Sequence, residues 1–156
     1  MYDVLAVVNW LRVKNDQDLQ WNLNAERITL MRTMKVLYYI QAASLVVYDH
    51  RFFNNVITKW KYSPMIRKVQ REYKGQGFPG TLTVEDLHDY NALEADSKAS
   101  DLLNSIYRVY GNSSAFDLMK QIESEDPWQE AEEGKAISDE SLKKYYSNVF
   151  SVVDEK

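Results

Sequence analysis

Few side chains in this sequence are suited to catalysis or metal binding. The chain of 156 residues contains no cysteine and two histidines, His50 and His88. The absence of cysteine excludes disulfides, thiolate zinc sites, iron–sulfur clusters and thiol catalysis. The two histidines lie 38 positions apart and no HExxH or calcium-loop pattern is present, so the sequence predicts no metal site. They are also the only bases open to a Ser–His–Asp triad, and no nucleophile-elbow motif accompanies them.

Phosphate binding and carboxylate catalysis are also weakly supported. Gly75, Gly77 and Gly80 are not spaced like a phosphate cradle, and neither GxxxxGKS, GxxxxGKT nor a strand-preceded GxGxxG occurs. Acidic residues are plentiful, so a glycosidase-type carboxylate pair stays open, but abundance alone does not indicate one. The sequence therefore predicts a protein that is not an enzyme and that has no cofactor.

Charge is divided unevenly along the chain. Residues 1–78 hold 12 Lys and Arg against 6 Asp and Glu, whereas residues 79–156 hold 7 against 17, which gives net charges of +6 and −10 and −4 overall. The basic residues are densest in residues 59–74, where aromatic residues interleave with them in a pattern that can grip phosphate and stack on bases. A pI of about 5.2 and the absence of a helix-turn-helix pair argue against strong nucleic-acid binding.

The many large aromatic residues favour a protein-binding module. The chain has 4 Trp, 11 Tyr and 5 Phe. Tyr and Trp are common at protein interfaces because they bury much area at small rotamer cost, although most of them are expected in the core. With catalysis unsupported, binding to another protein is the function that remains.

The first half of the chain predicts two helices and a short ribbon. Asp3 can cap a helix that ends near Val13, and residues 15–24 form a polar connection. Thr29 can cap a stronger helix to about Tyr48, which is apolar nearly all round and therefore predicted to be central. β-branched and aromatic residues predict a short β ribbon around residues 53–61. Ser63 and Pro64 then resemble the start of a helix, with Ser as N-cap and Pro at the first helical position.

The second half predicts further capped helices. Thr83 with Asp86 resembles a capping box that opens a helix, or a pair of helices, reaching Tyr110. Ser114 can cap a helix that the Asp126–Pro127 step should end. Ser138 can cap a last helix, whose apolar stripe comprises Leu142, Tyr145, Tyr146, Val149, Phe150 and Val153. We therefore expect a mainly α fold, a compact single domain over residues 1–156 with a bundle of about six helices. Because no run of about 18–20 apolar residues or signal peptide is present, we also expect no membrane partner and a cytoplasmic protein.

Six segments in register resemble one known family, the Panacea antitoxin domain. Residues 28–29 with 35–41 resemble its "IT…KLLYYAQ" helix, and residues 60–66 its "AW.YGPV" segment. Residues 110–118 resemble "YG.LSAWEL", residues 125–129 match "EDPW", and residues 137–146 resemble "IS.E.I..YF"; residues 69–74 resemble its "VY..Y". Ser63 stands where the family has the glycine of YGP, which indicates an ordinary φ at that position.

The resemblance implies a function as well as a fold. Panacea domains are mostly helical, occur in toxin–antitoxin operons and prophages, and neutralise very different toxins by direct contact. Many of those toxins stop translation. We therefore expect a cognate toxin encoded next to this protein as its partner, an oligomer formed with that toxin, and no strong nucleic-acid binding by the chain alone.

Two sets of residues follow from the resemblance and the charge pattern. Motif residues are interpreted as scaffold: Tyr38, Tyr39, Gln41, Trp60, Tyr62, Pro64, Asp126, Pro127 and Trp128. A toxin that binds RNA should have a basic active site, which acidic residues would complement. The candidate toxin contacts are Asp117, Glu123, Glu125, Glu130, Glu132, Glu133, Phe150 and Val153. Three alternatives stay open: a proteolytic adaptor, a phage regulatory protein that contacts nucleic acid through residues 59–74, and a hydrolase that uses His50 or His88.

Overall fold

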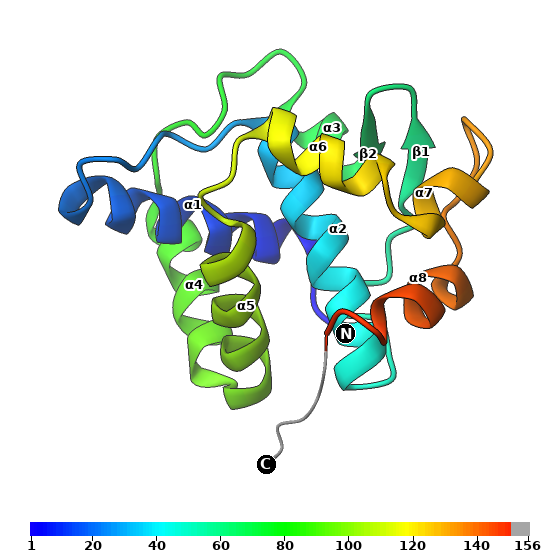
Figure 1. Ribbon diagram of the computed structural model, residues 1–156. Coiled ribbons are helices and arrows are strands. Elements are labelled where there is room, and N and C mark those ends of the chain that lie inside the picture. Colours follow the sequence, from blue (N-terminus) through cyan, green and yellow to red (C-terminus); the bar gives the residue numbers. More distant parts are fainter. Residues whose placement is uncertain (151–156) are drawn as a thin grey trace.

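A central helix, α2 (Leu30–Val47), organises the molecule (Figure 1). The computed structural model describes residues 1–150. The Thr29 hydroxyl accepts a hydrogen bond from the backbone N–H of Arg32 and caps α2, and every residue from 32 to 45 is buried. Helices α5 (Ser97–Tyr110), α6 (Ala115–Glu123) and α8 (Asp139–Tyr146) pack against it. The predicted central helix is confirmed.

The first helix, α1 (Val4–Trp21), is longer than the sequence predicts. The polar stretch that begins at Asn15 was expected to be a connection, and that prediction is wrong. The Asn15 side chain is 1% exposed, accepts from the backbone N–H of Ile28 (3.0 Å) and donates to the carbonyl of Glu26 (2.8 Å). Asn15 therefore joins the following loop to the helix. Its polar side chain makes tertiary contacts and does not end the helix.

A two-stranded antiparallel sheet follows, formed by β1 (Thr58–Trp60) and β2 (Ser63–Met65). The predicted ribbon is confirmed, but the helix start predicted at Ser63 is wrong, because α3 begins later (Arg67–Tyr73). The Ser63 hydroxyl accepts from the Lys35 ammonium (3.2 Å) and donates to the Pro64 carbonyl (2.8 Å) instead of capping a helix. Ser63 is not among the residues with positive φ, as the sequence indicated.

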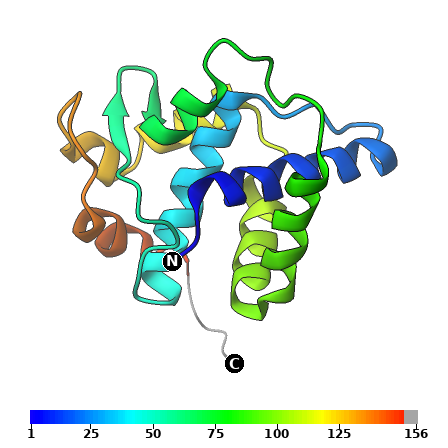
Figure 2. The same cartoon turned by 180° about the vertical axis from the view of Figure 1, so that it is seen from behind.

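Helix α4 (Val84–Ala95) and α5 form a pair that packs below α1 (Figures 1 and 2). Both capping-box hydrogen bonds between Thr83 and Asp86 are present, which confirms that prediction. Asp96 ends α4 and caps α5 by accepting from the backbone N–H of Ala99, so the predicted helix pair is also confirmed. The Trp10 indole of α1 donates to Glu94 of α4 (2.8 Å).

The last part of the chain adds α6, α7 (Asp126–Glu130) and α8. Ser114 and Ser138 cap α6 and α8 as predicted. Pro127 lies in the first turn of α7, where a missing N–H costs nothing, so the Asp126–Pro127 step starts a helix as well as following one. Residues 1–150 thus contain eight helices and one small sheet, which confirms the mainly α class. None of these helices is long and apolar enough to cross a membrane.

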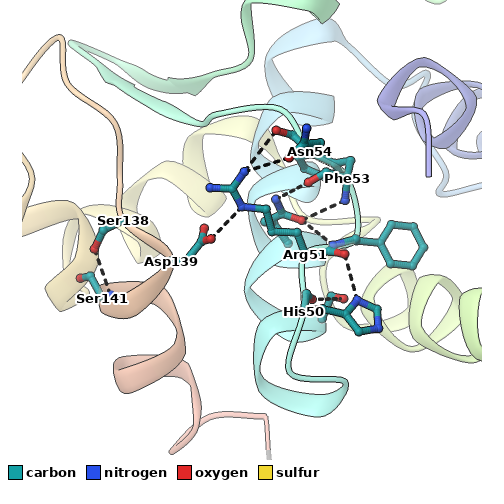
Figure 3. A network of polar contacts seen from close by, with 10 residues as sticks. His50, Arg51, Phe53, Asn54, Ser138, Asp139 and Ser141 are labelled. Carbon is teal, nitrogen blue, oxygen red and sulfur yellow. Dashed lines mark hydrogen bonds and ion pairs between the residues drawn. The ribbon is translucent and has the colours of Figure 1, made fainter. Parts of the chain in front are cut away.

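A polar network joins the loop after α2 to α8 (Figure 3). The Gln41 amide accepts from the backbone N–H groups of Phe52 (2.9 Å) and Phe53 (3.2 Å) and donates to the carbonyl of Phe53 (2.8 Å). Arg51 then donates through Nε to the carboxylate of Asp139 (2.7 Å), in the first turn of α8. One glutamine side chain therefore satisfies three buried backbone groups that no helix or strand can pair.

Replacing Gln41 should destabilise the fold without a large change in side-chain volume. We expect Gln41→Met to lower the free energy of unfolding by at least about 3 kcal/mol, because three buried polar groups lose their partner at about 1–3 kcal/mol each. Urea unfolding measures the change. Gln121→Met, at an exposed position of α6, is the control and should change the free energy of unfolding by less than about 0.5 kcal/mol. Equal effects of the two variants would contradict the role given to Gln41.

Candidate protein-binding site

The motif residues converge on one buried carboxylate, Glu125. Tyr39 of α2 and Tyr146 of α8 donate hydrogen bonds to the same carboxylate oxygen, at 2.8 and 2.7 Å. The hydroxyls of Tyr38 and Tyr146 lie 3.0 Å apart, and the Tyr110 ring stacks on the Tyr39 ring with a centroid distance of 4.0 Å. We call these five residues the tyrosine–glutamate cluster. It ties α2, α5 and α8 to the residue that precedes α7.

The predicted role of Glu125 as a toxin contact is wrong in this structure. Its side chain is 6% exposed and faces the tyrosine hydroxyls rather than solvent. Burial is possible because the two phenol groups donate to the carboxylate in place of water. Glu125 therefore holds the fold together and cannot meet a partner.

Burial also changes the acidity of the surrounding tyrosines. Desolvation, with the nearby charge of Glu125 as a second cause, raises the pKa of Tyr110 to about 12. Desolvation likewise raises the pKa of Tyr38, Tyr39 and Tyr146 well above the usual 10.0. All four groups therefore stay neutral as long as the domain is folded at ordinary pH.

The other motif residues divide into buried and exposed ones. Tyr38, Tyr39, Gln41, Pro64, Pro127 and Trp128 are buried, as a scaffold role requires. Lys59 of β1 donates to the carbonyls of Trp128 (2.8 Å) and Ala131 (3.1 Å), which joins the hairpin to the end of α7. Asp126 is exposed in the first turn of α7.

The scaffold interpretation is wrong for Trp60 and Tyr62. Their side chains are 41% and 70% exposed, with Trp60 at the end of β1 and Tyr62 in the turn of the hairpin. The sequence placed them among apolar residues, but only the local register shows that they point away from the core. They belong to the surface and not to the scaffold.

An apolar groove runs along α6 beside the hairpin. Its volume is about 360 Å³, and its lining comes from α2, the hairpin turn and α6: Met31, Lys35, Tyr62, Ala115, Phe116, Met119, Lys120 and Glu123. We call it the α6 groove. Met31, Tyr62 and Phe116 are 44%, 70% and 71% exposed, so its rim is formed by large apolar side chains in water. Exposed contiguous apolar surface of this kind is typical of protein-interaction sites.

Sequence reasoning did not find Met31 and Phe116. The signal lay in the helical spacing of α6, because Phe116, Lys120 and Glu123 recur at i, i+4 and i+7 on the face opposite the buried Leu118 and Ile122. Met31 stands in the first turn of α2, before the stretch that is buried all round. A second hollow, of about 510 Å³, lies between α2 and α5 next to Phe150, where the described chain ends.

The acidic candidates other than Glu125 lie at the surface. Asp117, Glu123, Glu130, Glu132 and Glu133 are exposed. Glu123 lines the α6 groove, and the backbone N–H of Gly134 donates to the carbonyl of Lys59 (2.7 Å), which holds the loop after α7 against β1. We call the loop after α7, which contains Glu132 and Glu133, the acidic loop. The acidic loop, the hairpin and α6 occupy the same end of the molecule (Figure 1). Phe150 is partly buried against the ring of Tyr146, and Val153 lies outside the described residues.

The basic segment, residues 59–74, is less available for binding nucleic acid than its composition suggests. Lys59 is engaged with α7, and Lys68 lies 3.6 Å from the carboxylate of Asp3. Arg67, Arg71 and Lys74 are exposed around α3. In residues 1–150, no three His, Cys, Asp or Glu side chains form a group that could hold a metal ion.

This arrangement defines a small helical domain whose motif residues build the interior and whose apolar groove and acidic loop face outward. A family model described as "Antitoxin SocA-like, Panacea domain" matches residues 33–129, which is more than half of the chain. The chain therefore belongs to this antitoxin family. The match runs from α2 to α7 and includes Glu125 and most of the α6 groove. Comparison with curated proteins found no match, and comparison with solved structures found none either.

Removal of the buried carboxylate should be far more damaging than removal of an exposed one nearby. We expect Glu125→Ala to lower the free energy of unfolding by about 3 kcal/mol or more, because two buried phenol hydroxyls lose their acceptor and a cavity opens. Glu123→Ala, two positions earlier and exposed, is the matched control and should change it by less than about 0.5 kcal/mol. Denaturant midpoints with unchanged m-values test this, and a mild effect of Glu125→Ala would show that the cluster is dispensable.

The tyrosine–glutamate cluster should also make the domain sensitive to alkali. Each buried tyrosine has a higher pKa in the folded than in the unfolded chain, so its contribution is complete below the unfolded value of 10.0 and declines as pH rises above it. The slope is about 1.4 kcal/mol per pH unit for each such group. We expect Tyr146→Phe to make the fall of the urea midpoint above pH 10 shallower. Tyr62→Phe, which removes an exposed hydroxyl outside the cluster, is the control.

Proposed function

We propose that this antitoxin-family protein neutralises a cognate protein toxin, encoded next to it, by binding the toxin directly. The observation that carries the proposal is the α6 groove, with Met31, Tyr62 and Phe116 exposed at its rim. When a partner covers large apolar and aromatic side chains that face water, the free energy of the complex falls. A stable complex would bury about 1,200–2,000 Å² in total.

The charge at this end of the molecule supports a particular class of toxin. Glu130, Glu132 and Glu133 are exposed beside the hairpin, within a half of the chain whose net charge is −10. A translation-inhibiting enzyme that acts on RNA needs a basic surface around its active site. Acidic residues would attract that surface, speed the encounter and compete with RNA for it. We therefore propose that the toxin is such an enzyme and that the complex forms in the cytoplasm.

Co-expression with the neighbouring toxin tests the proposal. The antitoxin should restore growth, and the two purified chains should elute together from a sizing column. Failure of both would overturn the proposal. Toxin half-life separates blocking from the proteolytic-adaptor alternative, because an adaptor shortens the half-life of the toxin and a blocker leaves it unchanged.

The groove predicts one residue whose removal weakens binding without weakening the fold. We expect Phe116→Ala to raise the Kd for the toxin about thirtyfold, as loss of a central aromatic contact worth about 2 kcal/mol would. Titration calorimetry measures the Kd, and urea unfolding should show a change of less than about 0.5 kcal/mol because the side chain is exposed.

The control is an equally exposed apolar residue on another face. Val109 of α5 is 62% exposed and does not line the α6 groove. Val109→Ala should leave the Kd for the toxin unchanged. If Val109→Ala weakened binding and Phe116→Ala did not, the toxin would bind a different surface.

A further inference from the structure

One lysine of the α6 groove is buried without a counter-ion among the described residues. Lys35 of α2 is 2% exposed and is nevertheless a lining residue, so it lies at the bottom of the groove. Its ammonium donates to the carbonyl of Met31 (3.3 Å) and to the hydroxyl of Ser63 (3.2 Å). Both acceptors are neutral, and an ammonium has three hydrogens to donate.

Within residues 1–150, no carboxylate supplies the missing charge. Of the ion pairs formed within residues 1–150, none includes Lys35, and Glu123, at the end of the groove, does not lie within ion-pair distance of it. Burying an ammonium without a carboxylate is unfavourable, because the interior replaces the hydration of the charge only in part. A group kept in this state at the bottom of an open groove is suited to pair with an anion from outside.

The composition of the groove selects the partner. Two lysines, Lys35 and Lys120, and one glutamate, Glu123, line it, so the lining carries a net positive charge. Its remaining lining is apolar, from Met31, Phe116 and Met119 among others. The complementary segment therefore carries an apolar side chain to fill the groove and a carboxylate to reach the ammonium.

We propose, on the basis of the function proposed above, that Lys35 is a specificity-determining residue that pairs with an Asp or Glu side chain of the toxin. That carboxylate is neighboured by an apolar side chain that lies between Met31, Tyr62 and Phe116. The basic surface of the same toxin faces the acidic loop after α7. The two contacts differ in sign, so together they fix the orientation in which the toxin binds.

Lys35→Met separates this role from a structural one. The substitution removes the buried charge, and the Ser63 hydroxyl, which loses the hydrogen bond from Lys35, still donates to the carbonyl of Pro64. The urea midpoint of the free protein should therefore stay the same or rise. The Kd for the toxin should rise about tenfold or more, as loss of a desolvated ion pair would. A lysine with only a structural role would lower the midpoint and leave the Kd of the folded variant unchanged.

Lys144→Met is the matched control. Lys144 is an exposed lysine of α8 and does not line the groove, so this variant should shift the Kd less than about threefold. An equal weakening by both variants would mean that only overall charge matters, and that result would overturn the proposal.

Substitutions in the toxin identify the carboxylate. Each Asp→Asn or Glu→Gln variant of the toxin is measured against wild-type antitoxin and against Lys35→Met. One toxin variant should raise the Kd for the wild-type antitoxin about tenfold. The same variant should leave the Kd for the Lys35→Met antitoxin unchanged. If removal of the toxin's C-terminal carboxylate alone behaves in this way, the assignment to a side chain is wrong. Absence of any wild-type complex overturns the proposed function, whereas a complex that Lys35→Met leaves intact overturns only the role of Lys35.

Discussion

The fold depends on how the carboxylate of Glu125 is kept out of water. No cation forms an ion pair with it within residues 1–150. Instead, the phenol hydroxyls of Tyr39 and Tyr146 donate hydrogen bonds that replace those from water. In a medium of low dielectric these hydrogen bonds are strong, and the loss of either one would leave a charged group short of a donor. The tyrosines come from α2 and α8, and the stack of Tyr110 on Tyr39 adds α5. Helices remote in sequence are thereby joined at one point. Hydrophobic packing alone would define their relative positions less precisely.

Local signals predicted most of the helices, and tertiary contacts caused the errors. Thr29, Thr83, Ser114 and Ser138 each start a helix as their spacing indicated, because each capping hydrogen bond joins residues only three positions apart. Asn15 was different, since its amide is used by the backbone of residues 26 and 28, which no local pattern reveals. Ser63 and Pro64 have the local pattern of a helix start, but pairing with β1 keeps them in a strand.

The resemblance to the family predicted the interior better than the surface. Its motifs mark residues such as Tyr39, Gln41 and Trp128, which the structure buries. They also include Lys35, Tyr62, Ala115 and Phe116, which line the α6 groove. Charge predicted the exposure of five acidic residues and failed at Glu125, because its burial depends on two tyrosines from helices on either side of it in sequence.

The long sequence separations within the tyrosine–glutamate cluster also govern how the protein matures during synthesis. Tyr39 leaves the ribosome 86 residues before Glu125, and Tyr38 precedes Tyr146 by 108. At about 5–20 residues per second, α2 waits on the order of 5–20 s for the groups that complete its surroundings. Until then the nascent chain lacks its closing contacts and is open to proteases and chaperones. The tyrosine–glutamate cluster is therefore complete only when translation has passed α8.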